Sequence, residues 1–166
     1  MMEFIPYKES SIIERNQIIF LGLSYKCDHA WNVLEAFSDK TRSGKLIQEI
    51  QQRSNIPIIM RNLVLWVPLD SSWKIRYPNK EEKIRWLAQF LEVLNTTTPK
   101  AVFIFWKEVL HTVLSCKSLE KISENTWKYW ITRIFYCTHP SYIMQYRRDQ
   151  KEEYIESILW KLKDII

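Results

Sequence analysis

The chain has 166 residues, a formal net charge of +5 at pH 7, and Phe, Trp or Tyr at 14% of its positions. The three cysteines include no CxxC pair, which argues against a disulfide framework. Charges occur throughout residues 1–17, which argues against a signal peptide, and the chain has no apolar run long enough to span a membrane. We therefore expect one cytoplasmic domain over residues 1–166, and its positive charge and many aromatic rings favour a nucleic-acid partner.

Four short apolar segments alternate with amphipathic ones along the chain. The apolar segments predict buried strands over Ile18–Leu23, Ile56–Leu69, Ala101–Phe105 and Ile131–Cys137. The amphipathic segments predict helices over residues 43–52, 79–95, 107–115 and 149–166. Asn79 with Glu82, and Asp149 with Glu152, can form capping boxes at the starts of two of them. This alternation predicts an α/β fold with a mostly parallel sheet that helices cover on both faces.

Two long connections interrupt the alternation, Ser24–Arg42 and Asp70–Asn79. Loops of that length in a compact domain are usually functional. Gly22 precedes the first loop, where the backbone can approach a ligand closely. Gly44 opens the following helix, where free N–H groups can hold a phosphate. Positive charge surrounds Gly44, on Lys40, Arg42 and Lys45.

The last predicted strand stops at the run His139-Pro140-Ser141. Pro140 ends ladder pairing because it lacks an N–H group and has a fixed φ. His139 therefore lies where a strand leaves its sheet, and ligands bind at that edge of open α/β sheets. On this stretch alone, a turn that holds a satisfied histidine is the simpler interpretation, so other segments have to decide.

Five segments in order resemble the uracil-DNA glycosylase superfamily: "FLGLS", "AFSDKTRSGKLI", "RNLVLWVPLD…YPNKEEKIRWLAQFLE", "KAVFIFWKEVL" and "THPSY". The similarity spans about residues 18–151 and looks closest to the branch of thermostable iron–sulfur enzymes and their cluster-free relatives. The resemblance implies a three-layer α/β/α sandwich on a four-stranded, mostly parallel sheet. It also implies a DNA substrate whose target base is flipped out of the stack.

The resemblance also implies roles for individual residues. Gly22, Leu23 and Ser24 fall in the loop that binds the base, and Phe37 falls where the family stacks an aromatic ring on it. Asn62 matches the asparagine that reads the base edge, and an amide offers both a donor and an acceptor for that task. His139 matches the histidine that hydrogen-bonds the departing base. Ser141 and Tyr142 match the segment that presses on the DNA backbone and minor groove.

A basic run follows that segment. We interpret Arg147, Arg148 and Lys151 as phosphate contacts, which position a protein on DNA without reading its sequence. A solvated helix start is an equally good interpretation of the same residues.

The chain departs from the iron–sulfur branch at its cysteines. The place of the cysteine ligand after the asparagine strand holds "VLWVP", and three scattered cysteines cannot supply four ligands. We therefore expect no cluster, no other cofactor and no metal. One alternative stays open, because Cys27 with His29 and Cys137 with His139 have C-x-H spacing that zinc could use.

A second departure concerns the first loop. Many relatives have a carboxylate or amide just after the glycine, where this chain has Leu23 and Ser24. A carboxylate from further along the loop could stabilise the positive charge that develops on the sugar. Asp28 is our first candidate and Asp39 our second, with Glu35 behind them; a solvated loop acid is the alternative for each.

These observations favour a monofunctional, monomeric DNA glycosylase that leaves an abasic site, since no lysine is obviously placed for Schiff-base chemistry. Its long polar and aromatic loop suits a bulky, hydroxyl-bearing pyrimidine, such as the glucosylated hydroxymethylcytosine of some phage DNA, and hence a role in phage defence. The alternatives are an ordinary uracil-repair enzyme, an inactive DNA-binding relative and a zinc-dependent hydrolase.

Overall fold

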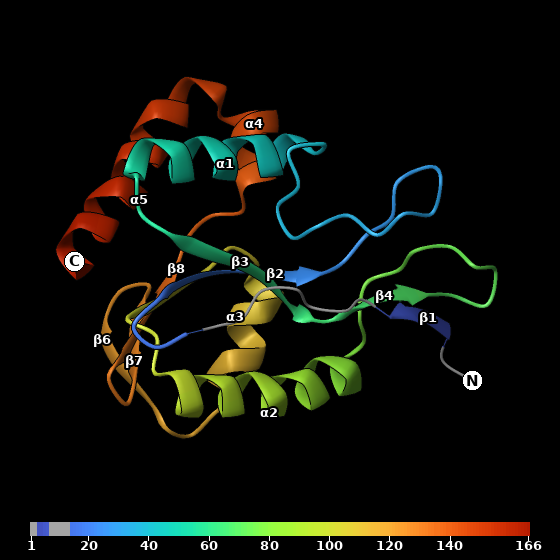
Figure 1. Ribbon diagram of the computed structural model, residues 1–166, viewed down its shortest axis with the longest axis horizontal. Helices are drawn as coiled ribbons and strands as arrows, with labels where there is room; N and C mark the ends of the chain where they lie inside the picture. Colours follow the sequence, from blue (N-terminus) through green and yellow to red (C-terminus); the bar gives the residue numbers. More distant parts are fainter. Residues whose placement is uncertain (1–2, 7–13) are drawn as a thin grey trace.

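The computed structural model describes residues 3–6 and 14–166, and the charged N-terminal segment lies partly outside them. A six-stranded sheet forms the centre of the molecule, in the order β3-β2-β5-β8-β7-β6 (Figure 1). Its parallel part consists of β2 (Ile18–Ser24), β3 (Ile58–Val64), β5 (Ala101–Ile104) and β8 (Thr132–Tyr136). The four predicted strands therefore form one parallel sheet.

The expected strand count of four was wrong, because a hairpin extends the sheet to six strands. Strand β6 (Leu119–Ser123) pairs antiparallel with β7 (Thr126–Tyr129), which pairs antiparallel with β8. Almost all of β6 is exposed, and in β7 only the alternate residues Trp127 and Tyr129 are buried. Such half-exposed strands have no continuous apolar run, so the pattern that identified the parallel strands does not detect them.

The predicted strand Ile56–Leu69 was also wrong in its extent. It is two strands, β3 and β4 (Trp66–Leu69), which Leu65 separates. Strand β4 leaves the large sheet and pairs antiparallel with β1 (Glu3–Pro6). The change of partner takes the chain away from the sheet edge at the point where the second long loop begins.

Helices cover both faces of the sheet (Figure 1). On one face lie α1 (Arg42–Ser54), α4 (Pro140–Tyr146) and α5 (Lys151–Ile165), and on the other lie α2 (Lys80–Thr97) and α3 (Lys107–Leu114). Successive strand residues serve the two cores in turn: Phe20 packs in the first and Leu21 in the second. In the described part of the chain, no helix has the length and apolar character to cross a membrane.

The two expected capping boxes had different outcomes. At the start of α2 the Asn79 side chain accepts from the Glu82 N–H and the Glu82 carboxylate accepts from the Asn79 N–H, which confirms the first. The second was wrong, because a 3-10 turn (Arg148–Gln150) precedes α5 and its N-cap, Gln150, makes no side-chain cap bond.

Glu82 also anchors the second long loop. The Arg76 guanidinium donates two hydrogen bonds of 2.8 Å to the two oxygens of Glu82, and its Nε donates to the Leu69 carbonyl. The Glu82 side chain is only 3% exposed. The Arg76 hydrogen bonds hold the pKa of Glu82 below its ordinary value despite this burial. One carboxylate therefore caps a helix and holds a loop.

We expect Glu82→Gln to lower the free energy of unfolding by about 2–3 kcal/mol, because it leaves the Arg76 charge without its anionic partner. The change Glu81→Gln, on the exposed side of the same helix turn, should alter it by less than about 0.5 kcal/mol. Urea unfolding measures both. Because the folded pKa of Glu82 lies below its ordinary 4.5, the loss should shrink as the pH falls below that value; a constant loss would contradict this account.

Candidate active site

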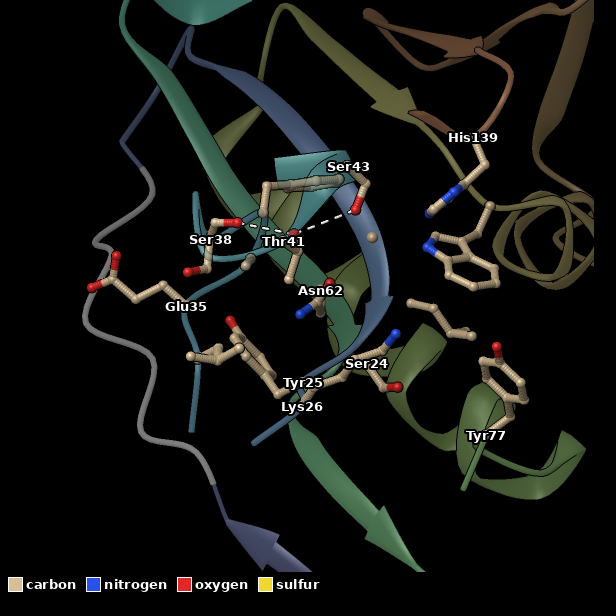
Figure 2. Close-up of a pocket in the computed structure, with 16 residues that line it drawn as sticks. Ser24, Tyr25, Lys26, Glu35, Ser38, Thr41, Ser43, Asn62, Tyr77 and His139 are labelled. Carbon is tan, nitrogen blue, oxygen red and sulfur yellow. Dashed lines mark hydrogen bonds between the residues drawn. The ribbon is translucent and has the colours of Figure 1, made fainter. Parts of the chain in front are cut away.

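A pocket lies where the parallel strands β2, β3, β5 and β8 end, next to the start of α1 (Figure 2). Its cavity of about 90 Å³ has room for a small flat ring, since one water needs only roughly 10–15 Å³. The lining residues are Gly22, Leu23, Ser24, Tyr25, Lys26, Leu34, Glu35, Ala36, Phe37, Ser38, Thr41, Ser43, Asn62, Tyr77, Trp106 and His139. All of the residues expected to bind the base lie here together.

Gly22 and Asn62 are paired across neighbouring strands at the floor of the pocket. A Cβ added at Gly22 would lie 2.3 Å from the Asn62 Oδ1 and 3.4 Å from the Phe37 ring. Position 22 therefore has to be glycine for the amide to lie over the strand. Asn62 is 6% exposed, and no residue in the described ranges hydrogen-bonds its side chain. Its donor and acceptor are available to a ligand.

Phe37 forms one side of the pocket in a strained backbone conformation. Its φ is 54°, a value that costs a bulky residue of order 1–3 kcal/mol. The ring packs edge-on against Phe105 at 5.5 Å, and the Gln48 amide donates to the Phe37 carbonyl at 3.0 Å. These contacts fix the ring beside Gly22.

Gly44 supports this arrangement rather than a phosphate. A Cβ there would lie 1.8 Å from the Ser38 carbonyl oxygen and 2.7 Å from that of Phe37. The Gly44 N–H donates to the Thr41 hydroxyl, which caps α1. The helix cap therefore uses the Gly44 N–H itself, and a phosphate contact of the other N–H groups at the start of α1 stays a prediction.

His139 is the N-cap of α4, and its ring faces the pocket beside Trp106, at 4.3 Å between centroids (Figure 2). The Ser141 N–H donates to His139 Nδ1 at 3.2 Å, and the Ser141 hydroxyl contacts the same nitrogen. Because Nδ1 accepts, the proton of the neutral ring is on Nε2. Burial, with the nearby Lys26 charge, lowers the pKa of His139 to about 4. His139 is thus a neutral Nε2–H donor at pH 7.

The structure does not bring the favoured loop acids to this pocket. The Asp28 carboxylate accepts from the Ala30 and Asn32 N–H groups and the Asn32 amide, and these bonds lower its pKa. Asp39 is exposed and is not among the lining residues. Glu35 lines the rim, but its carboxylate points away from the cavity (Figure 2). Neither Asp28 nor Asp39 therefore lines the cavity in the structure, and Asp28 is bonded within its own turn; a role for either acid beneath a sugar stays a prediction.

The expected DNA contacts lie at two places. Lys40, Arg42 and Lys45 are exposed around the start of α1, with the Lys40 ammonium 4.0 Å from Asp28. Ser141 is occupied with His139, so it positions the ring.

The second place is the surface of α4 and the turn after it. Tyr142, Arg147 and Arg148 are exposed there; Arg147 bonds the Tyr142 hydroxyl and Arg148 donates to the Met144 carbonyl. Lys151 instead pairs with Glu49 at 2.7 Å and joins α5 to α1.

Several lining residues were missed from the sequence. Trp106 directly follows β5, so the rule that the carboxyl ends of parallel strands meet at one edge could have found it. Tyr77 comes from the second long loop and Lys26 from the first, but nothing in their spacing distinguishes them from their neighbours.

The zinc alternative finds no support in the described residues, where no group of three or more His, Cys, Asp or Glu side chains could hold a metal ion. Cys137 is buried, and burial raises the pKa of its thiol to about 12, which disfavours the thiolate that zinc needs.

Comparisons with known proteins bear on this pocket. The family model described as the uracil DNA glycosylase superfamily matches residues 14–163. The crystal structure of wild-type SMUG2 from Pedobacter heparinus is similar, with a TM-score of 0.60 at 13% identity, over 91% of this chain and 76% of that one. This likeness concerns the fold alone. No curated protein sequence matches. Because the family model covers most of its length, the chain belongs to the uracil-DNA glycosylase superfamily, whose members are DNA glycosylases.

Proposed function

We propose that the chain is a monofunctional DNA glycosylase that takes a flipped pyrimidine into this pocket, cleaves its N-glycosidic bond and leaves an abasic site. One observation carries the proposal: the Phe37 ring, the Asn62 amide and the His139 imidazole line a single small cavity. These are the groups needed to stack on a base, read its edge and stabilise its departure. Membership of the superfamily supports DNA as the substrate.

The pocket residues compensate for what a base loses on leaving the duplex. Stacking on Phe37 contributes roughly 1–3 kcal/mol. Asn62 presents a donor and an acceptor to the pyrimidine edge. Because this amide is buried, a ring with a mismatched edge would leave it unpaired, which makes it selective.

Bond cleavage sends the electron pair of the C1′–N1 bond to the base, so the sugar becomes cation-like and the base anionic. The His139 Nε2–H donates to the base oxygen where negative charge develops; one such donor is worth about 3 kcal/mol. The Lys26 ammonium, close enough to lower the His139 pKa, adds positive charge on the same side. A water then adds to C1′ and loses its proton to bulk water.

For the substrate we propose a modified pyrimidine that carries hydroxyl groups. The Ser24, Ser43 and Tyr77 side chains line the pocket and can bond such a substituent. Leu23 and Ser24 stand where many relatives have a water-activating carboxylate or amide, which favours a leaving group other than plain uracil. Glucosylated hydroxymethylcytosine of phage DNA is the candidate, and the biological role is then defence against phage.

A second candidate is a DNA-binding relative without the reaction. No carboxylate of the described lining residues is aimed into the cavity, which favours this alternative. Ordinary uracil repair is the third possibility. It would use the same pocket for a base that carries no substituent.

We expect His139→Ala to lower single-turnover excision by roughly two to three orders of magnitude with DNA affinity nearly unchanged, because the donor acts on charge that exists only in the transition state. His111→Ala, on the exposed side of α3, is the matched control. Rapid-quench kinetics and fluorescence anisotropy measure the two quantities. An unchanged excision rate would remove His139 from the mechanism.

We expect the His139 ring to titrate near pH 4 with its proton on Nε2 above that pH, as measured by ¹⁵N–¹H NMR. Its folded pKa lies below its ordinary 6.5, so its contribution to stability is complete above pH 6.5 and is lost as the pH falls toward 4. Ser141→Ala should raise this pKa, since one partner of Nδ1 is lost. A proton on Nδ1, or titration near 6.5, would contradict the assignment.

The substrate proposal predicts faster base release from hydroxymethylated or glucosylated oligonucleotides than from uracil-containing ones, and none from ordinary cytosine or thymine. Mass spectrometry of the released base and alkaline cleavage of the strand measure both products. Efficient release of uracil alone would indicate ordinary repair, and binding without release would indicate the inactive relative. A monofunctional enzyme forms no Schiff base with the sugar, so borohydride should trap no covalent adduct between protein and DNA. An adduct that Lys26→Ala abolishes would contradict the monofunctional assignment.

A further inference from the structure

Two loops beside the pocket repeat the same turn around an aspartate. In the first, Asp28 N–H donates to the Asn32 carbonyl and Asp28 Oδ1 accepts from the N–H groups two and four residues later. In the second, Asp70 N–H donates to the Lys74 carbonyl and Asp70 Oδ1 accepts from the corresponding two N–H groups. The two loops share no sequence beyond the aspartate and a tryptophan three residues after it.

Both turns place that tryptophan in an unfavourable position. Trp31 has a φ of 63° and Trp73 one of 60°, where a bulky side chain is disfavoured and Gly or Asn is the usual residue. Their side chains are 53% and 60% exposed. Neither ring therefore gains much from burial in the fold, and strain at an exposed aromatic residue indicates a binding role.

The two tryptophans line one groove of about 660 Å³, together with Ile75, Lys40 and Lys74. The loops that carry them extend to the same side of the sheet (Figure 1). The Asp28 carboxylate also lines the groove, 4.0 Å from the Lys40 ammonium, and the Lys74 ammonium adds a second positive charge. Two aromatic rings with two cationic side chains match a single nucleic-acid strand, whose bases stack while its phosphates meet the positive charge. Leu34 lines both this groove and the pocket, so the groove is next to the place where a target base would enter.

We infer that Trp31 and Trp73 form a stacking subsite for unpaired bases of the DNA strand that carries the target nucleotide. A paired base in a duplex shows neither face to these rings, so the subsite favours single-stranded DNA. The choice of DNA as the ligand rests on the proposed function, and the preference for unpaired bases goes beyond that function.

The test is anisotropy titration of one unmodified oligonucleotide, single-stranded and as a duplex, which needs no excision. We expect Trp31→Ala and Trp73→Ala each to weaken single-strand binding roughly tenfold and to change duplex binding less than about twofold. Trp31→Phe should retain most of the single-strand affinity, because it keeps an aromatic ring at this position. The control is Trp160→Ala, because Trp160 is 69% exposed on α5 and lies outside the groove.

Unchanged single-strand affinity, or an equal loss for both forms of DNA, would overturn this inference. So would variants that bind the plain strand normally but release only the substituted base more slowly, because the groove would then hold the base substituent. Loss of excision in His139→Ala with intact strand binding leaves the subsite standing. Preserved tryptophan-dependent strand binding in a protein that excises nothing would instead refute the proposed function alone.

Discussion

The missing side chain at Gly22 is the constraint on which the pocket depends. A Cβ there would lie 2.3 Å from the Asn62 Oδ1, so only glycine lets this amide lie against the strand, and the Phe37 ring lies next to the same position. Gly44 serves the same purpose at the opposite side, where it admits the carbonyls of Phe37 and Ser38. The chain's two glycines thus set the distance between the sheet, the first loop and α1. A Cβ at Gly22 would displace the Asn62 amide, and a Cβ at Gly44 would displace the backbone of the first loop.

A neutral His139 imidazole follows from what surrounds this ring. Burial and the Lys26 charge disfavour the imidazolium, and the Ser141 N–H keeps Nδ1 as an acceptor, so the ring offers one fixed donor. Of the acids in the first loop, Asp28 is bonded within its own turn, Glu35 points its carboxylate away from the cavity, and Asp39 is exposed outside the lining. The proposed chemistry therefore depends on stabilising the departing base rather than on activating water.

The sequence predicted the parallel strands and the residues at their ends, because long apolar runs and the topology of α/β sheets determine both. The sequence did not predict side-chain partners that depend on a single contact. The Asp28 carboxylate bonds its own backbone because of the way the loop closes. The Ser141 hydroxyl contacts His139 because the two residues form the start of α4. The search for apolar runs did not detect the hairpin of β6 and β7, because only Trp127 and Tyr129 in it are buried. The sheet edge was thus predictable, while side-chain partners within loops were not.

The proposed mechanism depends on a hydrogen bond from the His139 Nε2–H to the departing base. The most direct measurement is ¹H–¹⁵N NMR of the product complex, the protein with abasic DNA and the free base. We expect the Nε2–H resonance to move strongly downfield and the Asn62 amide protons to shift in the same complex, while Nδ1 stays unprotonated. An unperturbed Nε2–H resonance in the saturated complex, with shifts confined to residues outside the pocket, would show that His139 does not bond the base.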